Sequence, residues 1–497
     1  MSDLLPARAD VVVVGGGLVG LELAKELDLR DVRDVLVLEA GPGDDLRHVN
    51  AANSADEAMR LWLEPERDRY FWRPWTSLSA PHYEGVAGLR KRLGGRSLYW
   101  QGVTLPLEPW ALRAPWWPEQ IVHDLTRSWQ GGASLYDRVQ ADLAVWRAEG
   151  ATSDPLRPLR IGRYELEETP QATRGSAENW EAYSPLSHWA EGLDARSTVI
   201  RMGVDVLSVV VTDGRVTGVL VCDPSGETRE IECVTVVLAA GAVENARLAT
   251  QAMHAAGVTA HKELDGLVDH LAQGFFVPFD PAVLPARLIE LADRDSFFHS
   301  VGDSTTRTNL FLRLYRNLKD SVVLDVWTMG EQLPGSDNAV MCRPRESSRW
   351  SVSIRAGLSE ADLEVVAAQR AELQSLWDAF CGEVGITTSV IEFPHFESCE
   401  RILEEVLPSL ADAAPDGRPV SWTRPLGTEY HEASTLPLGT RLTAEHELIG
   451  VSNLYAAGPA TFPRPGAANP SLTSFALARR LAAHLARRTT AVKEHGS

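Results

Sequence analysis

Two apolar runs and a helical segment between them open the chain. Val11–Val14 is one continuous run and Val35–Leu38 is the other. Residues 21–27 (LELAKEL) mix apolar and charged positions as an amphipathic helix does. Short continuous apolar runs are typical of buried parallel strands. The pattern therefore predicts strand, helix and strand, which is the unit of a parallel α/β sheet.

Three glycines follow the first run at the spacing of a dinucleotide-binding turn. Gly15 allows the tight turn, Gly17 lets the backbone approach a pyrophosphate, and Gly20 lets the helix pack on the strand. The helix N-terminus then presents free amides to the phosphates. Glu39 ends the second run, where a carboxylate can accept hydrogen bonds from a ribose. This order predicts a dinucleotide site, since a plain βαβ turn would have the acid there only by chance.

The alternation of strand and helix stops after Glu39, and segments that fit the first sheet return twice, at residues 233–242 and from Asn453. A Trp- and Pro-rich stretch runs from about residue 60 to 120, and a β-rich stretch lies near Val204–Val221. Residues 233–242 then form an apolar strand that ends in small residues, as a strand of the first sheet would. Residues 275–430 mix strands with one helical segment near 359–383, and the chain closes on Asn453 and an apolar helix.

We therefore expect an α/β protein with two interleaved domains. A Rossmann-like nucleotide-binding domain is predicted from residues 1–50, 200–274 and 440–497. An α+β domain built on an antiparallel sheet is predicted from residues 51–199 and 275–439. A chain of 497 residues is also too long for one simple core.

Composition narrows the class of protein only a little. The net charge of −20 argues against a nucleic-acid partner, because the phosphates would not be neutralised. It could favour a cationic substrate such as an amino sugar, although solubility is the simpler explanation. Five scattered cysteines, Cys222, Cys233, Cys342, Cys381 and Cys399, indicate neither a zinc site nor a disulfide framework. No apolar stretch is long enough to cross a membrane, and Asp10 leads straight into the first strand, so we expect a cytoplasmic protein.

Five motifs together resemble the glucose–methanol–choline family of flavin oxidoreductases. They occur in the family's order and span nearly the whole chain: the Gly15 turn with Glu39, Gly94–Ser97, Val237–Ala242, His431–Thr435, and Asn469–Pro470. The resemblance implies a non-covalent FAD and oxidation of a CH–OH group. It leans toward the branch of pyranose 2-oxidase and C-glycoside 3-oxidase, because Leu93–Trp100 is similar to a segment of that branch and Gly458 replaces the aspartate of many other members.

Two residues depart from the family's pattern. Tyr99 stands where members with covalently bound flavin have histidine, so we expect no histidyl–flavin bond. Ser434 replaces a glycine in the segment after His431, which puts the local backbone turn in question.

The resemblance assigns the chemistry to His431 and Asn469. Histidine suits a general base because its ordinary pKa lies near neutrality, and Asn469 would hydrogen-bond the substrate oxygen. The helix that starts at Pro470 would direct its dipole at the reduced flavin. The resemblance also implies a set of cofactor contacts: Gly15, Gly17, Leu18, Gly20, Glu39, Arg92, Gly94, Gly95, Ser97, Trp100, Val206, Ala240, Gly241, Gly458 and Pro470.

Several residues outside the motifs are weaker candidates. His82 and His188 stand beside aromatic residues and could line a sugar site, although a histidine outside a motif is more often structural. Trp72 and Trp100 are candidate substrate contacts, since aromatic faces stack on the apolar face of a pyranose. Gln332 is a further candidate contact. His270 resembles an Asp-His segment of the family and is expected to be structural.

The leading hypothesis is FAD-dependent oxidation of a sugar, glycoside or related polyol, with electrons passing to O2 or to another acceptor. A lyase with a redox-silent FAD, on the same scaffold, is the alternative. A flavin-bound protein that acts only as a binding module is disfavoured by the intact His431 and Asn469. A nicotinamide dehydrogenase would share the Gly15 turn but would not explain Asn469 and Pro470. The sequence leaves the substrate, the oxidised carbon and the oligomeric state open.

Overall fold

A mostly parallel sheet carries the glycine turn near the start of the chain. Its strands run in the order β10-β2-β1-β13-β12-β11, and β22 pairs with β13. The strands are β1 (Arg8–Val14), β2 (Val35–Glu39), β10 (Val199–Met202), β11 (Asp205–Thr212), β12 (Arg215–Cys222), β13 (Thr228–Leu238) and β22 (Leu454–Ala456). Val11 of β1 lies opposite Val35 on one side and Thr235 on the other, so segments more than 200 residues apart form one sheet.

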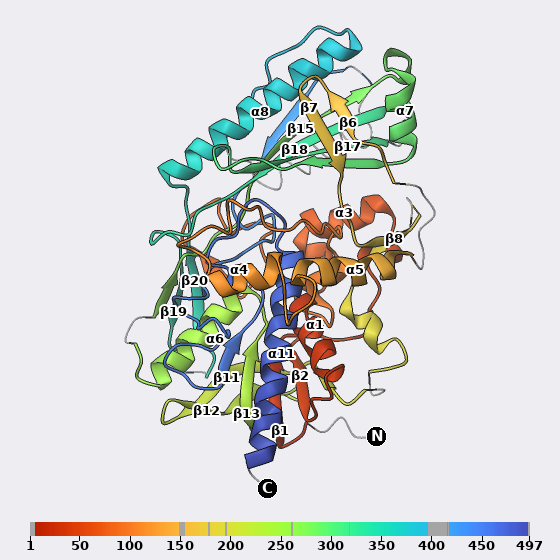
Figure 1. Ribbon diagram of the computed structural model, residues 1–497. Coiled ribbons are helices and arrows are strands. Elements are labelled where there is room, and N and C mark those ends of the chain that lie inside the picture. Colours follow the sequence, from red (N-terminus) through yellow and green to blue (C-terminus); the bar gives the residue numbers. More distant parts are fainter. Residues whose placement is uncertain are drawn as a thin grey trace.

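The computed structural model describes residues 5–148, 155–176, 179–193, 196–259, 262–317, 319–346, 348–395, 415 and 417–495. Within these ranges, helices cover both faces of the first sheet. Alternate residues of β1 face opposite sides: Val11 and Val13 pack with α1 (Leu18–Asp28) and α11 (Ser471–His495). Val12 and Val14 belong to the cluster that contains α6 (Ala242–Ala255). Figure 1 shows α1 and α11 side by side in front of the sheet, although they come from opposite ends of the chain.

A second, antiparallel sheet forms the upper part of the molecule in Figure 1. Its order is β21-β15-β18-β17-β16-β7-β6. The strands are β6 (Leu159–Ile161), β7 (Tyr164–Glu168), β15 (Leu271–Phe279), β16 (Ser296–Ser300), β17 (Thr308–Arg316), β18 (Val322–Gly330) and β21 (Val420–Thr423). The expected domain boundary at residue 274 falls inside β15, because this strand begins earlier, at Leu271, and is buried along its whole length.

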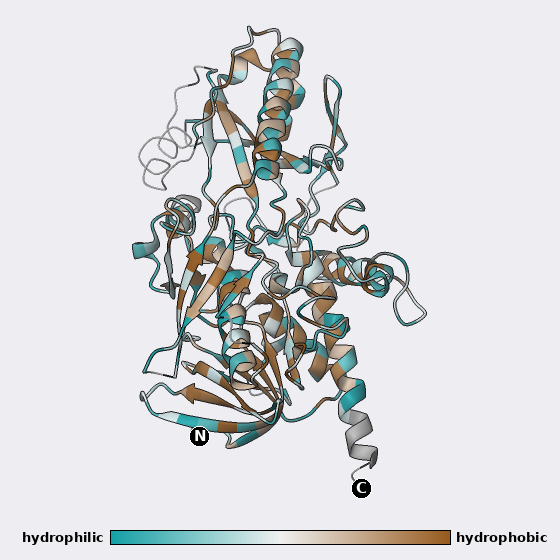
Figure 2. Ribbon diagram, turned by 90° about the vertical axis from the view of Figure 1, so that its left-hand side faces the viewer, coloured by the Kyte–Doolittle hydropathy of each residue, from teal (hydrophilic) through white to brown (hydrophobic). Residues whose placement is uncertain are grey.

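One long helix covers one face of the second sheet. Helix α8 (Glu360–Val384) starts at a capping box formed by Ser359 and Asp362, and ends at Gly385, whose φ is +76°. Its Trp377 packs against the rings of Phe275 and Phe279 on β15. Figure 2 shows this helix lying against the sheet, and also shows that the strands of the first sheet are largely hydrophobic. The opposite face of the second sheet is therefore left to line the interior of the molecule.

Shorter elements connect and cover the two sheets. A four-stranded sheet, in the order β14-β19-β20-β4, lies beside α6. The remaining strands and helices among the described residues are β3 (Phe71–Trp72), β4 (Trp75–Ser77), β5 (Leu89–Arg90), β8 (Thr173–Gly175), β9 (Trp180–Ala182), β14 (Glu263–Asp265), β19 (Ala339–Arg343), β20 (Ser351–Arg355), α2 (Val49–Ala52), α3 (Ala55–Leu63), α4 (Glu119–Thr126), α5 (Leu135–Ala148) and α7 (Ala286–Asp293). The Trp- and Pro-rich stretch thus forms mostly short elements and loops.

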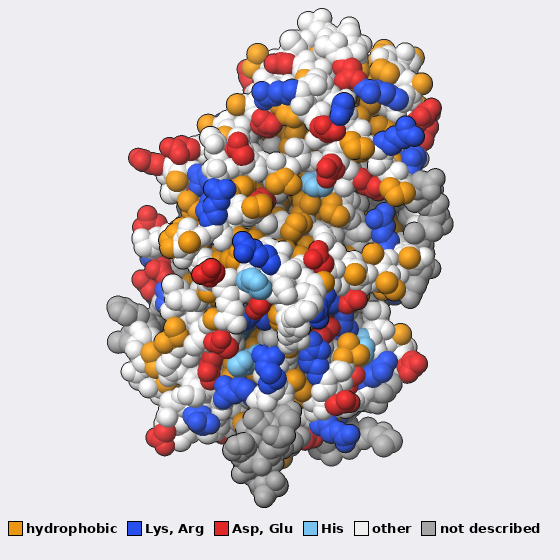
Figure 3. Space-filling model, in the orientation of Figure 1, with side chains coloured by type: hydrophobic (Ala, Val, Ile, Leu, Met, Phe, Trp, Pro, Cys, Tyr) orange, Lys and Arg blue, Asp and Glu red, His pale blue; other side chains and the backbone are white. Residues whose placement is uncertain are grey.

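The described residues add three observations, on membrane-spanning helices, on cysteines and on surface charge. None of their helices is both long and apolar enough to cross a membrane. Four of the cysteines are free thiols, and Cys399 lies outside the described residues. On the face shown in Figure 3, positive and negative side chains are interspersed, so the net charge of −20 does not form one continuous acidic surface there.

Candidate active site

One cavity of about 490 Å³ joins the two sheets. It is lined at the first sheet by the glycine turn and Glu39, and at the second by strands β16, β17 and β18. His431 and Asn469 line the same cavity. A volume of this order suits an organic ligand, because small-molecule sites usually enclose about 300 to 1,000 Å³.

The glycine turn leaves room on the cavity side only. Gly15 has a φ of +107°, and a Cβ added to it would lie 2.6 Å from the carbonyl oxygen of Ala239. A Cβ on Gly20 would collide with the carbonyl oxygen of Gly15. A Cβ on Gly17 would meet no described atom within 4 Å, and Gly17 lines the cavity. Thus two glycines are needed for packing, and the third leaves the space that a pyrophosphate would fill.

Glu39 is held by the backbone with its side chain in the cavity wall. One carboxylate oxygen accepts a hydrogen bond of 2.9 Å from the amide of Gly16, and the other accepts one of 2.7 Å from the amide of Gly41. Burial raises the pKa of Glu39 to about 7. Each carboxylate oxygen can accept more than one hydrogen bond, so Glu39 retains capacity for ribose hydroxyls.

Two helix N-termini face this cavity. The N-cap of α1 is Gly17, which offers no side-chain cap to the free amides of the first turn. Pro470, Ser471 and Ser474 at the start of α11 also line the cavity. Helix N-termini carry partial positive charge and free N–H groups, so both ends favour anionic or electron-rich ligand groups.

His431 and Asn469 meet at the edge of the cavity. Nε2 of His431 lies 3.4 Å from Nδ2 of Asn469. The Oδ1 atom of Asn469 is buried and has no hydrogen-bond partner among the described residues. A buried amide oxygen without a partner is costly, so this atom is suited to meet a bound ligand.

His270 lies behind His431. The Nδ1 atoms of the two rings are 2.8 Å apart, and Nε2 of His270 lies 3.0 Å from the carbonyl oxygen of Gly466. Burial lowers the pKa of His270 to about 4. Burial, then His270 and the Arg96 guanidinium, hold the pKa of His431 well below its usual range. Both rings are therefore neutral near pH 7.

The backbone of His431 is held by Asp269. The carboxylate of Asp269 accepts hydrogen bonds from the amides of Gly427, Glu429 and His431 at 2.7, 3.2 and 3.0 Å. Burial, then the charges of Glu432 and Glu429, raise the pKa of Asp269. A second clamp follows at once: Arg96 makes an ion pair with Glu432 and donates to the carbonyl oxygen of Tyr430 at 3.0 Å.

The turn after His431 keeps a glycine-like backbone without a glycine. Ser434 has a φ of +68°, in the left-handed region that favours glycine. Its amide donates to the carbonyl oxygen of Pro459 at 3.1 Å. The substitution therefore leaves the turn intact, and its backbone strain is carried by surrounding contacts.

Most of the residues predicted to bind the cofactor line the cavity. These are Gly15, Gly17, Leu18, Glu39, Gly95, Trp100, Val206, Ala240, Gly241, Gly458 and Pro470. Gly20, Arg92, Gly94 and Ser97 do not line it. They support it from behind: Gly94 donates its amide to the carbonyl oxygen of Gly16 at 2.8 Å, and Ser97 donates to that of Gly94 at 2.7 Å.

The weaker candidate residues also divide into those that line the cavity and those that lie behind its wall. Trp72 lines the cavity, as Trp100 does. Three others lie in its supporting structure: His188 contacts Asp28 at 2.9 Å, His82 accepts the amide of Leu426 at 3.2 Å, and Gln332 accepts the amide of Asp269 at 3.1 Å.

Sequence reasoning missed the wall contributed by the second sheet. Trp327 of β18 stacks on Phe297 and on Phe311, with ring centroids 5.3 and 5.4 Å away, and the rings of these two residues are themselves 5.9 Å apart. All three residues line the cavity. Arg313 and Asp325 line it as well and lie opposite each other on β17 and β18. The alternation of Asp325, Trp327 and Met329 was the available signal, but it does not reveal which face is covered by α8.

No family model matches the chain. It is 24% identical over 372 residues to 5-(hydroxymethyl)furfural oxidase of Methylovorus sp. (strain MP688). That match covers 61% of this chain and 66% of the oxidase, which is just under two thirds of its length.

Solved structures match over nearly the whole chain. Pyridoxine 4-oxidase from Mesorbium loti has a TM-score of 0.60 at 16% identity, over 96% of this chain and 99% of its own. Formate oxidase has a TM-score of 0.63 at 13% identity, over 98% and 99%. A formate oxidase variant from Aspergillus oryzae, studied for its FAD modification, also scores 0.63 at 14% identity, with the same coverage. The chain therefore shares its fold with these oxidases over nearly its whole length.

Proposed function

We propose that the chain is an FAD-dependent oxidoreductase that oxidises a CH–OH group of a small molecule to a carbonyl. The observation that carries this proposal is the position of His431 and Asn469 on the cavity that begins at the glycine turn. The similar proteins support it, because they are oxidases and one of them, formate oxidase, was studied for the modification of its FAD.

The residues of the cavity fit a bound FAD. Gly17 leaves space for the pyrophosphate beside the N-terminus of α1, and Glu39 offers acceptors for the ribose. The N-terminus of α11 would face the flavin ring. When bound, FAD would supply the two-electron acceptor that the protein's own side chains lack. Tyr99 offers no ring nitrogen for attachment, so we propose a non-covalent cofactor.

His431 would take the hydroxyl proton, and Asn469 would hold the substrate oxygen. A neutral imidazole with a lone pair at Nε2 can accept the proton directly. The amide of Asn469 can donate a hydrogen bond to the oxygen as negative charge develops on it. A positioned base of this kind contributes on the order of a hundred- to ten-thousand-fold in rate.

Two classes of substrate suit the wall formed by Phe297, Phe311 and Trp327. Aromatic side chains stack on the apolar face of a pyranose, which agrees with a sugar, glycoside or related polyol. They stack equally on a flat aromatic alcohol, and the names 5-(hydroxymethyl)furfural oxidase and pyridoxine 4-oxidase favour that second class. Arg313 and Asp325 offer polar contacts to either.

Anaerobic titration of the purified holoprotein tests the proposal. The flavin spectrum would be followed while monosaccharides, amino sugars, glycosides, 5-(hydroxymethyl)furfural and pyridoxine are added in turn. Bleaching by one class establishes the reaction and names the substrate class. Re-oxidation on admitting air would then identify O2 as an acceptor. Turnover of an added compound while the flavin stays oxidised would contradict the proposal and favour a redox-silent lyase.

A further inference from the structure

The carbonyl oxygen of Gly466 can only accept a hydrogen bond. It lies 3.0 Å from Nε2 of His270, so the proton of this contact must be on Nε2. Two neighbouring carboxylates fix the direction in which the Gly466 carbonyl group points. The amide of Gly466 donates to Glu331 at 3.2 Å, and the amide of Ala467 donates to Glu108 at 3.2 Å. Arg464 makes two further hydrogen bonds to Glu331, at 2.7 and 2.8 Å, so the carboxylate itself is held in place.

A neutral His270 that carries its proton on Nε2 has a bare Nδ1. This atom lies 2.8 Å from Nδ1 of His431, and two bare nitrogens would repel each other at that distance. The contact is a hydrogen bond only if His431 carries its proton on Nδ1. Its Nε2 is then left with a lone pair, next to the amide group of Asn469, which can donate to it.

We propose that His270 is a positioning residue, which transmits the direction of the Gly466 carbonyl to His431 and sets His431 in the tautomer with the proton on Nδ1 and a free lone pair on Nε2. This inference rests on the proposed function only in the use of the Nε2 lone pair, which is to accept the proton of the substrate hydroxyl. The opposite tautomer would present an N–H to the substrate hydroxyl and could not accept its proton. The protein therefore selects the basic form of His431 through a neutral partner, whereas a carboxylate behind the ring would also stabilise its protonated form.

Nitrogen NMR of the FAD-bound protein tests the tautomers without any substrate. The chain would be labelled with 15N-histidine, and long-range 1H–15N spectra would separate protonated from bare ring nitrogens. Among the 13 histidines, the signals of the pair would be assigned by their loss in His431→Ala and His270→Phe. We expect a proton on Nδ1 of His431 and on Nε2 of His270. A proton on Nε2 of His431 would overturn the proposal.

Two variants test whether His270 is the cause. His270→Phe keeps a ring of similar size but removes the acceptor, so a substantial share of His431 should move to the form protonated on Nε2. His270→Asn restores an acceptor near the position of Nδ1 and should recover the original form. A His431 signal that is unchanged in His270→Phe would show that another group sets the tautomer. If His270→Phe fails to fold, His270→Asn also removes the His270 signals, so the pair can still be assigned and its tautomers read in the wild-type spectrum. Because no turnover is needed, the result is independent of whether a substrate is found.

Discussion

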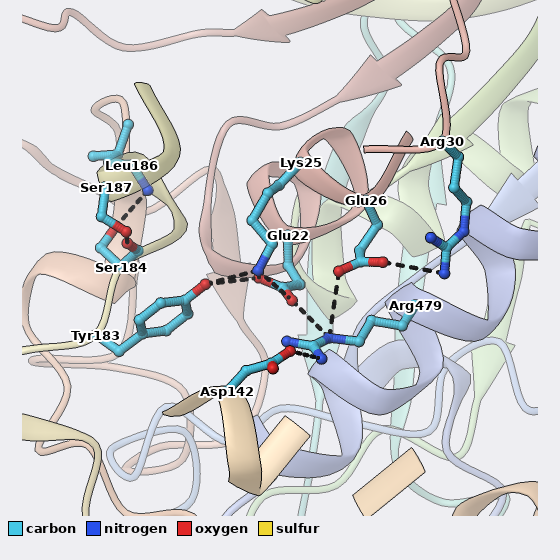
Figure 4. A network of polar contacts seen from close by, with 10 residues as sticks. All are labelled: Glu22, Lys25, Glu26, Arg30, Asp142, Tyr183, Ser184, Leu186, Ser187 and Arg479. Atoms are coloured by element: carbon cyan, nitrogen blue, oxygen red, sulfur yellow. Dashed lines mark hydrogen bonds and ion pairs between the residues drawn. The ribbon is translucent and has the colours of Figure 1, made fainter. Parts of the chain in front are cut away.

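Arg479 of α11 donates a hydrogen bond of 2.9 Å to Glu22 of α1, although 457 residues separate them. The side chain of Glu22 is fully buried, and it also accepts from Lys25 and from the hydroxyl of Tyr183 at 3.1 Å. Figure 4 shows these side chains converging between the two helices, with Asp142 on the outer side of Arg479. Both helices begin at the cavity, so this contact fixes the relative position of the two N-termini that face it.

Replacing Arg479 with Met should destabilise the protein strongly. Glu22 would remain buried with less compensation, and breaking such a pair costs about 3–5 kcal/mol. The measurement is the free energy of unfolding in urea. Asp142→Asn is the control, because the Asp142 side chain is 65% exposed and its ion pair should contribute at most about 1 kcal/mol. The double variant Glu22→Leu, Arg479→Met should recover much of the loss; equal stability of Arg479→Met and wild type would contradict this role.

Gly17→Ala and Gly20→Ala should fail in different ways. Gly17 has a φ of −87°, which alanine adopts freely, and its added methyl group enters only the cavity. We expect normal melting of the apoprotein and FAD affinity reduced by about tenfold or more, which corresponds to about 1.4 kcal/mol. The methyl group of Gly20→Ala collides with Gly15, so the fold itself should lose about 1–3 kcal/mol. Unchanged FAD binding by Gly17→Ala would exclude the cofactor from this turn.

His431→Ala should retain FAD and lose its reduction by substrate by at least about a hundredfold, because the base is removed while the cavity stays open. Stopped-flow absorbance of the flavin measures the reductive step. His123→Ala is a matched control, since His123 lies exposed on α4, and it should reduce at the wild-type rate. Near-normal reduction in His431→Ala would remove this residue from the mechanism.

Acid precipitation should release all the flavin into solution. Tyr99 is 1% exposed, accepts a hydrogen bond of 3.3 Å from Arg92, and does not line the cavity. Its hydroxyl therefore does not face the space that the flavin would occupy, so we expect no covalent bond through Tyr99. The absorbance of the supernatant and of the washed pellet measures the distribution, and yellow colour that stays in the pellet would refute the prediction.

His446 should make the protein less stable in mild acid. Burial lowers its pKa to about 3, so between this value and 6.5 the unfolded chain binds a proton that the folded chain rejects. Stability then falls as pH decreases, by about 2 kcal/mol between pH 7 and pH 5 from this one group. His446→Asn keeps a donor for the carbonyl oxygen of Ala456 and tolerates the φ of +70°. Urea unfolding at both pH values should show a smaller loss in this variant; equal losses would contradict the assignment.

The sheet that carries the glycine turn was largely predictable because its signals are local. The valine run, Gly15, Gly20 and Glu39 each reflect a requirement of one turn or one strand, and the structure places them in one βαβ unit. The expectation of an FAD-dependent oxidoreductase likewise agrees with the names of the similar proteins, which are oxidases. The leaning toward sugar oxidases rested on the segment Leu93–Trp100 and on Gly458, and those names do not reproduce it.

The substrate side was not predictable in the same way. Trp327 and Asp325 alternate with Leu324 and Val326 on β18, but this alternation does not say what covers each face. Only the packing of α8 decides which face lines the cavity. His270 was expected to be structural from its resemblance to an Asp-His segment of the family. Its neighbours in the chain say nothing of Gly466 or His431, which lie 196 and 161 residues away.

Local sequence was thus sufficient for the strands and the glycine turn, because backbone conformation and side-chain type act at short range. The choice of His431 and Asn469 came from the family resemblance and stays a prediction. The cavity, the neutral pair of His270 and His431, and the burial of Glu22 against Arg479 depend on the folded chain. Desolvation and hydrogen bonding act between atoms in space, and only the tertiary structure brings those atoms within reach of one another.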